Sequence, residues 1–476
     1  MDERGFYLTT AIPYVNAKPH IGHAQECVIA DVLHRYHEIM GNRVFFVSGA
    51  DENALKNVQA AEREGLGVAE FLDKYSSLFR DFFRHMGVKI DVFRRGSDQS
   101  QHWPGVQRLW RRCVRSGDIY KKKYIGLYCV GCESFKTETD LINGLCPDHS
   151  VAPERIAEEN YFFRLSRYRK RLEHLIVSGK LTIVPEKRKR EILSFLRQGL
   201  EDFSVSRSNL RARGVGVPIP GDLTQKMYVW FDALTIYMTA VGYGYDNRLW
   251  RRWWPADVHV IGKDIIRFHA VYWPAILLSA GLPLPKTLLV HGFITSGGRK
   301  ISKSIGNVVD PLSIIERYGL DATRYYLLRE IPTLDDGDFT VRRFEDLYQS
   351  DLAGGLGNLV SRIAKLCATS AHAFSLPPPR RFSEVTSNYI KDYRFDLALS
   401  SIWDSIHALD LTLEQTRPWQ LSADPLRDLL QRLVDRMRTI AFDLRPFLPG
   451  TAEEIENIFA GPQIRAVSPL FPRMKL

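Results

Sequence analysis

The first fifty residues most constrain what this chain can fold into. Residues 6–12 form a short apolar and β-branched run that predicts a buried strand, and prolines at 13 and 19 break the run into a turn. Apolar residues then recur at helical spacing from residue 28 to Met40, and Gly41 provides a helix stop. A second apolar run follows at residues 44–48. This order of strand, helix and strand predicts a doubly wound parallel sheet of the α/β class, which binds ligands beyond the carboxyl ends of its strands.

The turn before the predicted helix carries two histidines and a glycine. His20, Gly22 and His23 fall at the N-terminus of this helix, where unpaired backbone N–H groups and the helix dipole favour an anion. Gly22 leaves room for a close approach, and two imidazoles can donate hydrogen bonds to phosphate. The pattern therefore predicts a phosphate site, and its alternative is a pair of histidines in a solvated turn. Asp51, which follows the second predicted strand, is expected in the same crevice.

Length and composition bound the class of protein. A chain of 476 residues is too long for one hydrophobic core, so we expect roughly two to four domains. The contents of 45% hydrophobic and 25% charged residues are typical of a soluble globular protein. A formal charge of +10 favours a polyanionic partner, although charge alone does not distinguish nucleic acid from an acidic membrane surface. No apolar leader or long uninterrupted apolar stretch is found, so we expect a cytoplasmic protein without a membrane partner.

Three of the six cysteines cluster with a histidine. Cys129 and Cys132 form one Cys-x-x-Cys pair, and Cys146 and His149 form a second pair with the same spacing. Four protein ligands would close a tetrahedron around Zn²⁺ and leave no position for water, so the spacing predicts a structural zinc site. The alternative is a loop of reduced cysteines beside a coincidental histidine.

The rest of the first 300 residues alternates between predicted strands and helices. Further strands are predicted at residues 159–165, 227–238, 258–266 and 287–295, and helices at 54–65, 68–86, 103–116 and 186–200. After the last strand, residues 296–304 (SGGRKISKS) join a glycine pair to Lys300, Ser302 and Lys303. Two lysines beside hydroxyl groups on a mobile turn can wrap a polyphosphate, and the alternative is a flexible basic loop.

The order of these motifs resembles a known family. PHIGH at residues 19–23, IGKD at 261–264 and KISKS at 300–304 resemble the signatures of a class I aminoacyl-tRNA synthetase, with Ile301 in place of the usual methionine. The sequences AIPYVNAKPHIGH, YCVGCESF, NYFFRLS, YVWFDAL and GNLVSR narrow the resemblance to the methionyl-tRNA synthetase family. This resemblance covers essentially the whole chain.

The resemblance implies a fold, a reaction and a division of the chain. The fold would be a Rossmann-like catalytic domain with a zinc-knuckle connective insertion and a C-terminal α-helical anticodon-binding bundle. Its parts would be the first catalytic half at 1–116, the insertion at 117–225 with knuckles at about 126–152, the second catalytic half at 226–295, the KISKS loop and stem-contact region at 296–345, and the anticodon-binding domain at 346–476. The enzyme would join ATP and methionine as methionyl-adenylate, release pyrophosphate, and transfer methionine to the 3′-terminal ribose of tRNA(Met).

The family's functional residues map onto this chain. ATP, with Mg²⁺, would be bound by His20, Gly22, His23, Gly262, Asp264, Lys300, Ser302 and Lys303, and the two histidines and two lysines among them would act in catalysis. Methionine would be bound by Ile12, Tyr14, Asp51, Trp230, Tyr237, Ile265, Phe268 and His269. In that pocket Asp51 would pair with the α-ammonium group, and the Tyr237 hydroxyl would donate to the thioether.

The C-terminal part is expected to contact tRNA. From residue 343 onward the pattern is helical, and the resemblance assigns anticodon reading to Asn358, Arg362 and Trp419. An aromatic ring that stacks on a base, beside groups that hydrogen-bond to base edges, is how single-stranded RNA loops are usually read. Because the chain ends at the family's LFPR sequence (residues 470–473), without an appended dimerisation domain, we expect a monomer.

The chain departs from the family at a few positions beside the predicted site. Ala50, Asn53 and Ala54 replace a threonine, a histidine and a glycine of the family's GTDEHG sequence, and Val215 stands where a tryptophan is usual. These changes fit a housekeeping enzyme, but they also fit a divergent paralogue that activates an amino acid outside translation, or a weakened tRNA-binding protein. A small-molecule nucleotidyltransferase that shares only the HxGH turn is disfavoured by the helical C-terminal part and the paired knuckles.

Overall fold

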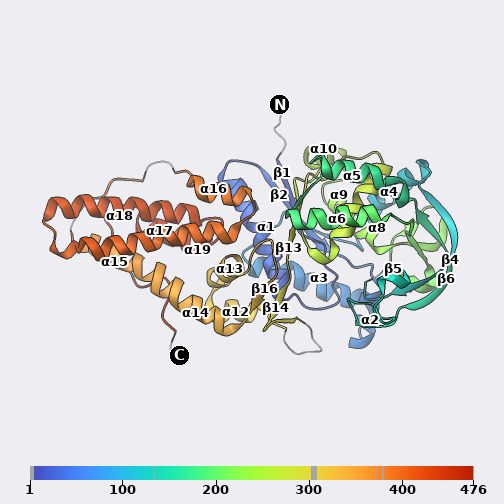
Figure 1. Ribbon diagram of the computed structural model, residues 1–476, viewed down its shortest axis with the longest axis horizontal. Coiled ribbons are helices and arrows are strands. Elements are labelled where there is room, and N and C mark those ends of the chain that lie inside the picture. Colours follow the sequence, from blue (N-terminus) through green and yellow to red (C-terminus); the bar gives the residue numbers. More distant parts are fainter. Residues whose placement is uncertain (1–4, 133, 302–307, 371, 378–379, 475–476) are drawn as a thin grey trace. The chain divides into compact units, whose positions relative to one another are not determined.

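The computed structural model describes residues 5–132, 134–301, 308–370, 372–377 and 380–474 (Figure 1). The chain forms two compact units. The first contains residues 1–19 and 42–290, and the second contains residues 20–41 and 291–476. Among the described residues, no helix is both long and apolar enough to cross a membrane.

A six-stranded sheet organises the first unit. Its order is β3-β2-β1-β12-β13-β7, and the strands are β1 (Phe6–Thr9), β2 (Val44–Ala50), β3 (Val92–Arg95), β7 (Thr182–Val184), β12 (Val258–Gly262) and β13 (Thr287–His291). β1 pairs in parallel with β2 and with β12, and Leu8 lies opposite both Phe46 and Val258. The predicted doubly wound parallel sheet is therefore confirmed.

The middle of the chain contributes to this sheet as well as to sheets of its own. β7 lies inside the predicted insertion but pairs in parallel with β13, a connection that the sequence analysis missed. The flanking helices α5 (Arg169–Val177) and α6 (Glu186–Gln198) place Ile176 and Ile192 in the same hydrophobic core as the sheet. This stretch is thus a structural part of the six-stranded sheet.

Antiparallel strands form the remainder of the insertion. A four-stranded sheet of order β5-β4-β6-β8 contains β4 (Ile119–Cys129), β5 (Ser134–Lys136), β6 (Glu154–Phe163) and β8 (Phe203–Ser204). A three-stranded sheet of order β10-β11-β9 contains β9 (Ser206–Ser208), β10 (Pro218–Ile219) and β11 (Asp222–Met227), and α7 (Asn209–Ala212) lies between its strands in sequence. β6 includes most of the strand predicted at residues 159–165.

The other helices of the first unit include those predicted at residues 54–65, 68–86 and 103–116. They are α2 (Leu55–Glu64), α3 (Val68–His85), α4 (Trp103–Arg115), α8 (Val229–Ala233), α9 (Ile236–Thr239), α10 (Asn247–Trp253) and α11 (Trp273–Ser279). The strand predicted at residues 227–238 is wrong, because this run forms α8 and α9. Every residue from Met227 to Met238 is buried. Because no residue in this run is exposed, the hydrophobic periodicity does not separate a helix from a buried strand.

The second unit is mainly helical. Its helices are α1 (Ile21–Ile39), α12 (Pro311–Tyr318), α13 (Leu320–Arg329), α14 (Val341–Leu347), α15 (Asn358–Thr369), α16 (Glu384–Lys391), α17 (Phe395–Thr416), α18 (Ala423–Leu444) and α19 (Pro449–Ile458), and a π-helical segment spans Tyr348–Gly357. A small sheet of order β15-β14-β16 contains β14 (Ile294–Ser296), β15 (Arg299–Lys300) and β16 (Gly337–Phe339). α15, α17 and α18 lie side by side in Figure 1. The described residues after 340 contain no strand, which confirms the predicted helical C-terminal part.

Candidate active site and metal site

Two histidines cap the first helix of the second unit. His20 is the N-cap residue of α1, and its Nδ1 accepts a hydrogen bond of 3.1 Å from the backbone N–H of Gly22. The backbone N–H of His20 in turn donates to Nδ1 of His23 at 3.1 Å, so the two imidazoles form a capping box. A Cβ on Gly22 would lie 3.0 Å from the His20 ring, so any other residue would require this ring to shift by a few tenths of an ångström.

These hydrogen bonds fix which ring nitrogens can donate. Because Nδ1 of each neutral imidazole accepts a backbone N–H, the proton of each ring is on Nε2, which can donate to an anion. The ring centroids are 4.1 Å apart. Burial, together with the positive charge that His20 and His291 can carry, holds the pKa of His23 well below its usual range. His23 is therefore a neutral donor at neutral pH.

The lysine-rich segment is described only in part. Arg299 and Lys300 form β15, which pairs antiparallel with β14, whereas Ser302 and Lys303 lie outside the described residues, as does the side chain of Lys300. On the C-terminal side of this segment, the carbonyl of Val309 accepts a hydrogen bond of 3.2 Å from the backbone N–H of Ile21, the first residue of α1. The chain that follows the predicted KISKS motif thus returns to the start of α1.

The carboxyl ends of three neighbouring strands carry polar groups in the first unit. Tyr14 follows β1, Asp51 follows β2, and Gly262 ends β12 just before Asp264. Tyr14 and Asp51 form an isolated parallel bridge, and the backbone N–H of Asp51 donates to the carbonyl of Pro13 at 2.9 Å. Asp264 is exposed. Because β2, β1 and β12 are parallel neighbours, these residues meet at the edge of the sheet where ligands of such folds bind.

Aromatic rings extend from this edge. Tyr14 contacts Trp230 edge to face at 6.0 Å between ring centroids, and Trp230 stacks on Phe268 at 3.8 Å with an angle of 6°. Ile12 and Ile265 are partly buried against the same hydrophobic core. The structure thus brings the predicted methionine-binding residues of the first unit together.

A hydrogen-bonded pair lies deeper among these rings. Nδ1 of His269 lies 3.0 Å from the carbonyl oxygen of Ile265 and donates its proton to it, so Nε2 is left to accept from the Tyr237 hydroxyl at 2.8 Å. The only hydroxyl proton of Tyr237 is therefore engaged. Donation from Tyr237 to a thioether, as predicted from the sequence, requires that this hydrogen bond be exchanged.

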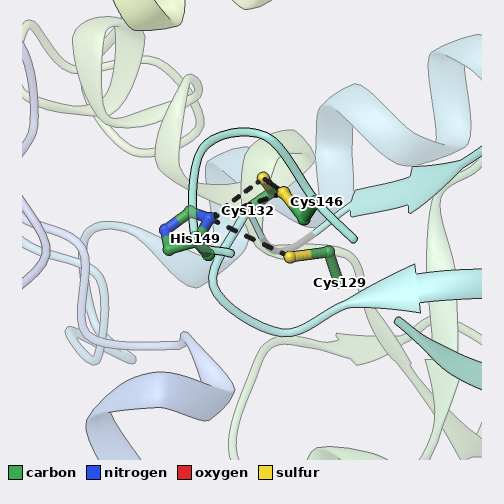
Figure 2. Close-up of side chains that lie close together, drawn as sticks. All are labelled: Cys129, Cys132, Cys146 and His149. Carbon is green, nitrogen blue, oxygen red and sulfur yellow. Dashed lines mark hydrogen bonds between the residues drawn. The ribbon is translucent and has the colours of Figure 1, made fainter. Parts of the chain in front are cut away.

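Four side chains converge in the predicted zinc knuckles, as Figure 2 shows. The Sγ atoms of Cys132 and Cys146 are 3.4 Å apart, and Nδ1 of His149 lies 3.9, 3.4 and 3.8 Å from the Sγ atoms of Cys129, Cys132 and Cys146. A tetrahedral Zn²⁺ with its usual bond lengths would separate such atoms by about 3.6–3.8 Å. The donor set therefore fits a four-coordinate soft-ligand metal.

The thiols of Cys132 and Cys146 differ, because burial and the hydrogen bond to Cys146 raise the pKa of the Cys132 thiol. Burial works against ionisation, but hydrogen bonds from the Cys132 thiol and from the backbone N–H groups of Asp148 and His149 outweigh burial and lower the pKa of the Cys146 thiol. A thiolate is the form that binds metal. The other cysteines, Cys27, Cys113 and Cys367, are buried.

The predicted anticodon residues lie on α15 and just beyond α17. Asn358 is exposed at the start of α15, and Arg362 on the same helix forms an ion pair with Asp410 of α17. Trp419 follows the end of α17 in a 3₁₀ turn, and 63% of its side chain is exposed. An exposed indole of this kind presents a stacking surface.

The chain is similar to known proteins of one family. The chain matches the family described as tRNA synthetases class I (M) over residues 6–155 and 139–364. The methionine–tRNA ligase of Clostridium acetobutylicum is 40% identical over 477 residues, which cover 96% of this chain and 73% of that protein. The methionine–tRNA ligase of Brucella melitensis is 39% identical and covers 97% of this chain and 93% of its own length.

A solved structure agrees with these relatives. The crystal structure of Mycobacterium tuberculosis methionyl-tRNA synthetase bound by methionyl-adenylate matches with a TM-score of 0.91 and 34% identity, over 98% of this chain and 100% of that chain. The chain belongs to the methionyl-tRNA synthetase family. It is therefore a class I aminoacyl-tRNA synthetase, as the sequence motifs predicted.

The structure explains how this member of the methionyl-tRNA synthetase family accommodates two of its departures. Nδ2 of Asn53 donates to Asp232 at 2.5 Å and to the carbonyl of Gly96 at 2.9 Å. Nε2 of His102 lies 2.6 Å from the other carboxylate oxygen of Asp232. Both oxygens of this buried side chain therefore have a hydrogen-bond partner, although asparagine stands at residue 53 where the family has histidine. Ala54 has a φ of −85°, a conformation that does not need glycine.

Sequence reasoning missed this network around Asp232. Asp232 and His102 lie 130 positions apart. Asp232 falls in the run predicted as a strand, and His102 immediately precedes α4, so neither pattern indicated the other residue as a partner. The only available signal was a charged residue within the apolar run of residues 227–238, which requires a buried partner. The network ties α8, which carries Trp230, to the loop after β2.

Acid is expected to destabilise the protein partly through His269. Burial lowers the pKa of His269 to about 4, so the unfolded state takes up this proton first as the pH falls below about 6.5. Between pH 7 and pH 4, His269→Gln should therefore lose about 2–3 kcal/mol less free energy of unfolding than the wild type. Urea titrations across this range measure the difference. Replacement of the exposed His85 with glutamine should leave the loss of free energy of unfolding between pH 7 and pH 4 as it is in the wild type. A loss in His269→Gln equal to that of the wild type would contradict the expectation.

Proposed function

We propose that this protein is a methionine–tRNA ligase that forms methionyl-adenylate from methionine and ATP and then esterifies the 3′-terminal ribose of tRNA(Met). The observation that carries the proposal is the cluster of aromatic rings of Tyr14, Trp230 and Phe268 at the edge of the sheet where ligands of such folds bind. Aromatic rings make favourable contacts with a polarizable thioether side chain. Membership of the methionyl-tRNA synthetase family supports the same substrate.

Adenylate formation needs alignment and charge neutralisation. A carboxylate oxygen of methionine attacks the α-phosphorus of ATP, and the bond from that phosphorus to the bridging oxygen breaks as pyrophosphate leaves. We assign donation to phosphate oxygens to Nε2 of His20 and His23, whose tautomer the capping box fixes. Lys300 and Lys303, with Ser302, are assigned to the pyrophosphate side. Gly262 and Asp264 are assigned to adenosine, with Asp264 accepting from the ribose hydroxyls.

The amino acid is assigned to the first unit. Asp51 would pair with the α-ammonium group, and the eight pocket residues would enclose the side chain by shape. Because methionine has no strong hydrogen-bonding handle, one methylene more or less changes binding by only about 1–3 kcal/mol. Shorter analogues should therefore compete with methionine.

Two metals belong to this proposal. Mg²⁺ would accompany ATP and neutralise charge on its phosphates. Zn²⁺ is assigned to Cys129, Cys132, Cys146 and His149 as a structural ion, because four protein ligands leave no open position. Metal analysis of the purified protein tests this assignment, and a zinc content near zero would count against it.

The remaining assignments concern tRNA and the state of the protein. Asn358, Arg362 and Trp419 are proposed to read the anticodon, with the base stacked on the exposed Trp419. A monomeric, cytoplasmic enzyme with the five-part division described above completes the proposal.

Two assays in sequence test the function. Methionine-dependent exchange of labelled pyrophosphate into ATP reports adenylate formation, and charging of tRNA(Met) reports the second step. The proposal expects both activities. Exchange without charging would instead indicate a paralogue that acts outside translation, and tRNA binding without exchange would indicate a binding protein.

A further inference from the structure

Lys56 on α2 contacts both the cluster of aromatic rings around Tyr14 and the loop that carries the predicted zinc ligands. Its Nζ atom lies over the ring of Tyr14, 3.1 Å from the ring centroid, and donates to the carbonyl oxygen of Gly131 at 3.3 Å. The Lys56 side chain is half-buried. One ammonium group therefore contacts a residue of the aromatic cluster and the backbone of the metal knuckle, the loop that carries Cys129, Cys132, Cys146 and His149.

The knuckle fixes the Gly131 end of this connection. Gly131 lies between Cys129 and Cys132, and a Cβ at this position would lie 2.4 Å from the ring of His149. The backbone of Gly131 is thus packed directly against one predicted ligand and flanked by two others. The position of its carbonyl oxygen depends on how these three ligands are held.

Tyr14, at the other end, is one of the residues proposed to bind methionine. Its backbone is bridged to Asp51, and its ring meets Trp230 edge to face. An ammonium group over the ring face restrains the tilt of the ring, because the attraction falls when the cation leaves the face. Lys56 and Trp230 thus both contact the Tyr14 ring in the orientation seen here.

We propose that Lys56 is a positioning residue that couples the metal knuckle to the methionine pocket. The knuckle orients the Gly131 carbonyl, the carbonyl holds the ammonium group, and the ammonium group sets Tyr14 against Trp230. The knuckle then has a second role besides local folding, because it tunes affinity for the amino acid. This inference rests on the proposed function, since it takes methionine as the ligand of the pocket.

Lys56→Met removes the charge and keeps the length of the side chain. The dissociation constant and the KM for methionine should rise about 5- to 30-fold, the range expected for a partly desolvated cation–π contact, whereas kcat, the KM for ATP and the zinc content should stay unchanged. Lys56→Arg keeps a cation and should restore methionine affinity to within about threefold. Lys122→Met is the matched control, because Lys122 lies over the ring of Phe162 elsewhere in the insertion.

Removal of the metal tests the coupling itself. Calorimetric titration of methionine into metal-loaded and chelator-treated protein should show weaker binding after treatment in the wild type, and no further weakening in Lys56→Met. An equal effect of chelation in both proteins, or unchanged methionine affinity in Lys56→Met, would overturn the coupling. Wild-type, metal-loaded protein that binds no methionine would overturn the proposed function, and with it this inference.

Discussion

Replacement of His23 with asparagine is expected to lower the rate of methionine-dependent ATP–pyrophosphate exchange by about 10²- to 10³-fold, the usual cost of losing one preorganised donor to a developing negative charge. The asparagine oxygen can still accept the backbone N–H of His20, as Nδ1 of His23 does at 3.1 Å. The cap of α1 is therefore retained, whereas the Nε2–H donor is lost.

Two further variants make this expectation specific. His23→Gln places an amide near the former Nε2 position and should recover part of the rate. His37→Asn, in the last turn of the same helix, should leave exchange near the wild-type value. Exchange in His23→Asn within about threefold of the wild type would remove His23 from the phosphate site.

Replacement of Arg324 with methionine is expected to lower the free energy of unfolding by about 3 kcal/mol, the lower end of the cost of breaking a buried ion pair, because Asp31 keeps its second partner, Arg35, at 2.6 Å. Arg324 of α13 and Asp31 of α1 are joined at 2.7 Å, and both side chains are 0% exposed. The same guanidinium donates to the carbonyls of Phe447 and Pro446 at 2.7 and 3.0 Å. Methionine would leave all three acceptors without this donor.

Urea titration measures the loss. Arg317→Met is the matched control, because Arg317 is 66% exposed in its ion pair with Glu345 and should contribute no more than about 1 kcal/mol. Replacing both members of the buried pair, as in Asp31→Leu with Arg324→Met, should recover part of the stability because no lone charge stays buried. A loss below about 1 kcal/mol in Arg324→Met would contradict a structural role for the pair.

Much of the fold could be predicted from local patterns. The apolar spacing after residue 28 predicted α1, and the paired Cys and Cys/His spacing predicted a metal site whose four side chains the structure brings together. Both signals are local, because each depends only on the spacing of residues within one short stretch of the sequence. β7 was missed since a three-residue strand is too short to show periodicity, and its partner β13 is about 100 positions away.

The candidate site was less predictable because its geometry depends on contacts between distant segments. Spacing alone could not show that His269 Nε2 engages the Tyr237 hydroxyl, since this depends on the Ile265 carbonyl that fixes the tautomer. Nor could it show that Lys56 meets both Tyr14 and Gly131, because α2 looks like an ordinary surface helix. Family resemblance named the pocket residues, but it did not indicate how these residues are held.

The central claim is that the imidazoles at the start of α1 and the lysines at 300 and 303 act on the same triphosphate. Exchange activity of a Lys300→Ala and Lys303→Ala double variant, with folding checked by circular dichroism, tests this claim most directly. We predict a folded protein whose methionine-dependent exchange is at least about 10²-fold slower than that of the wild type. A folded double variant that exchanges at nearly the wild-type rate would contradict the account.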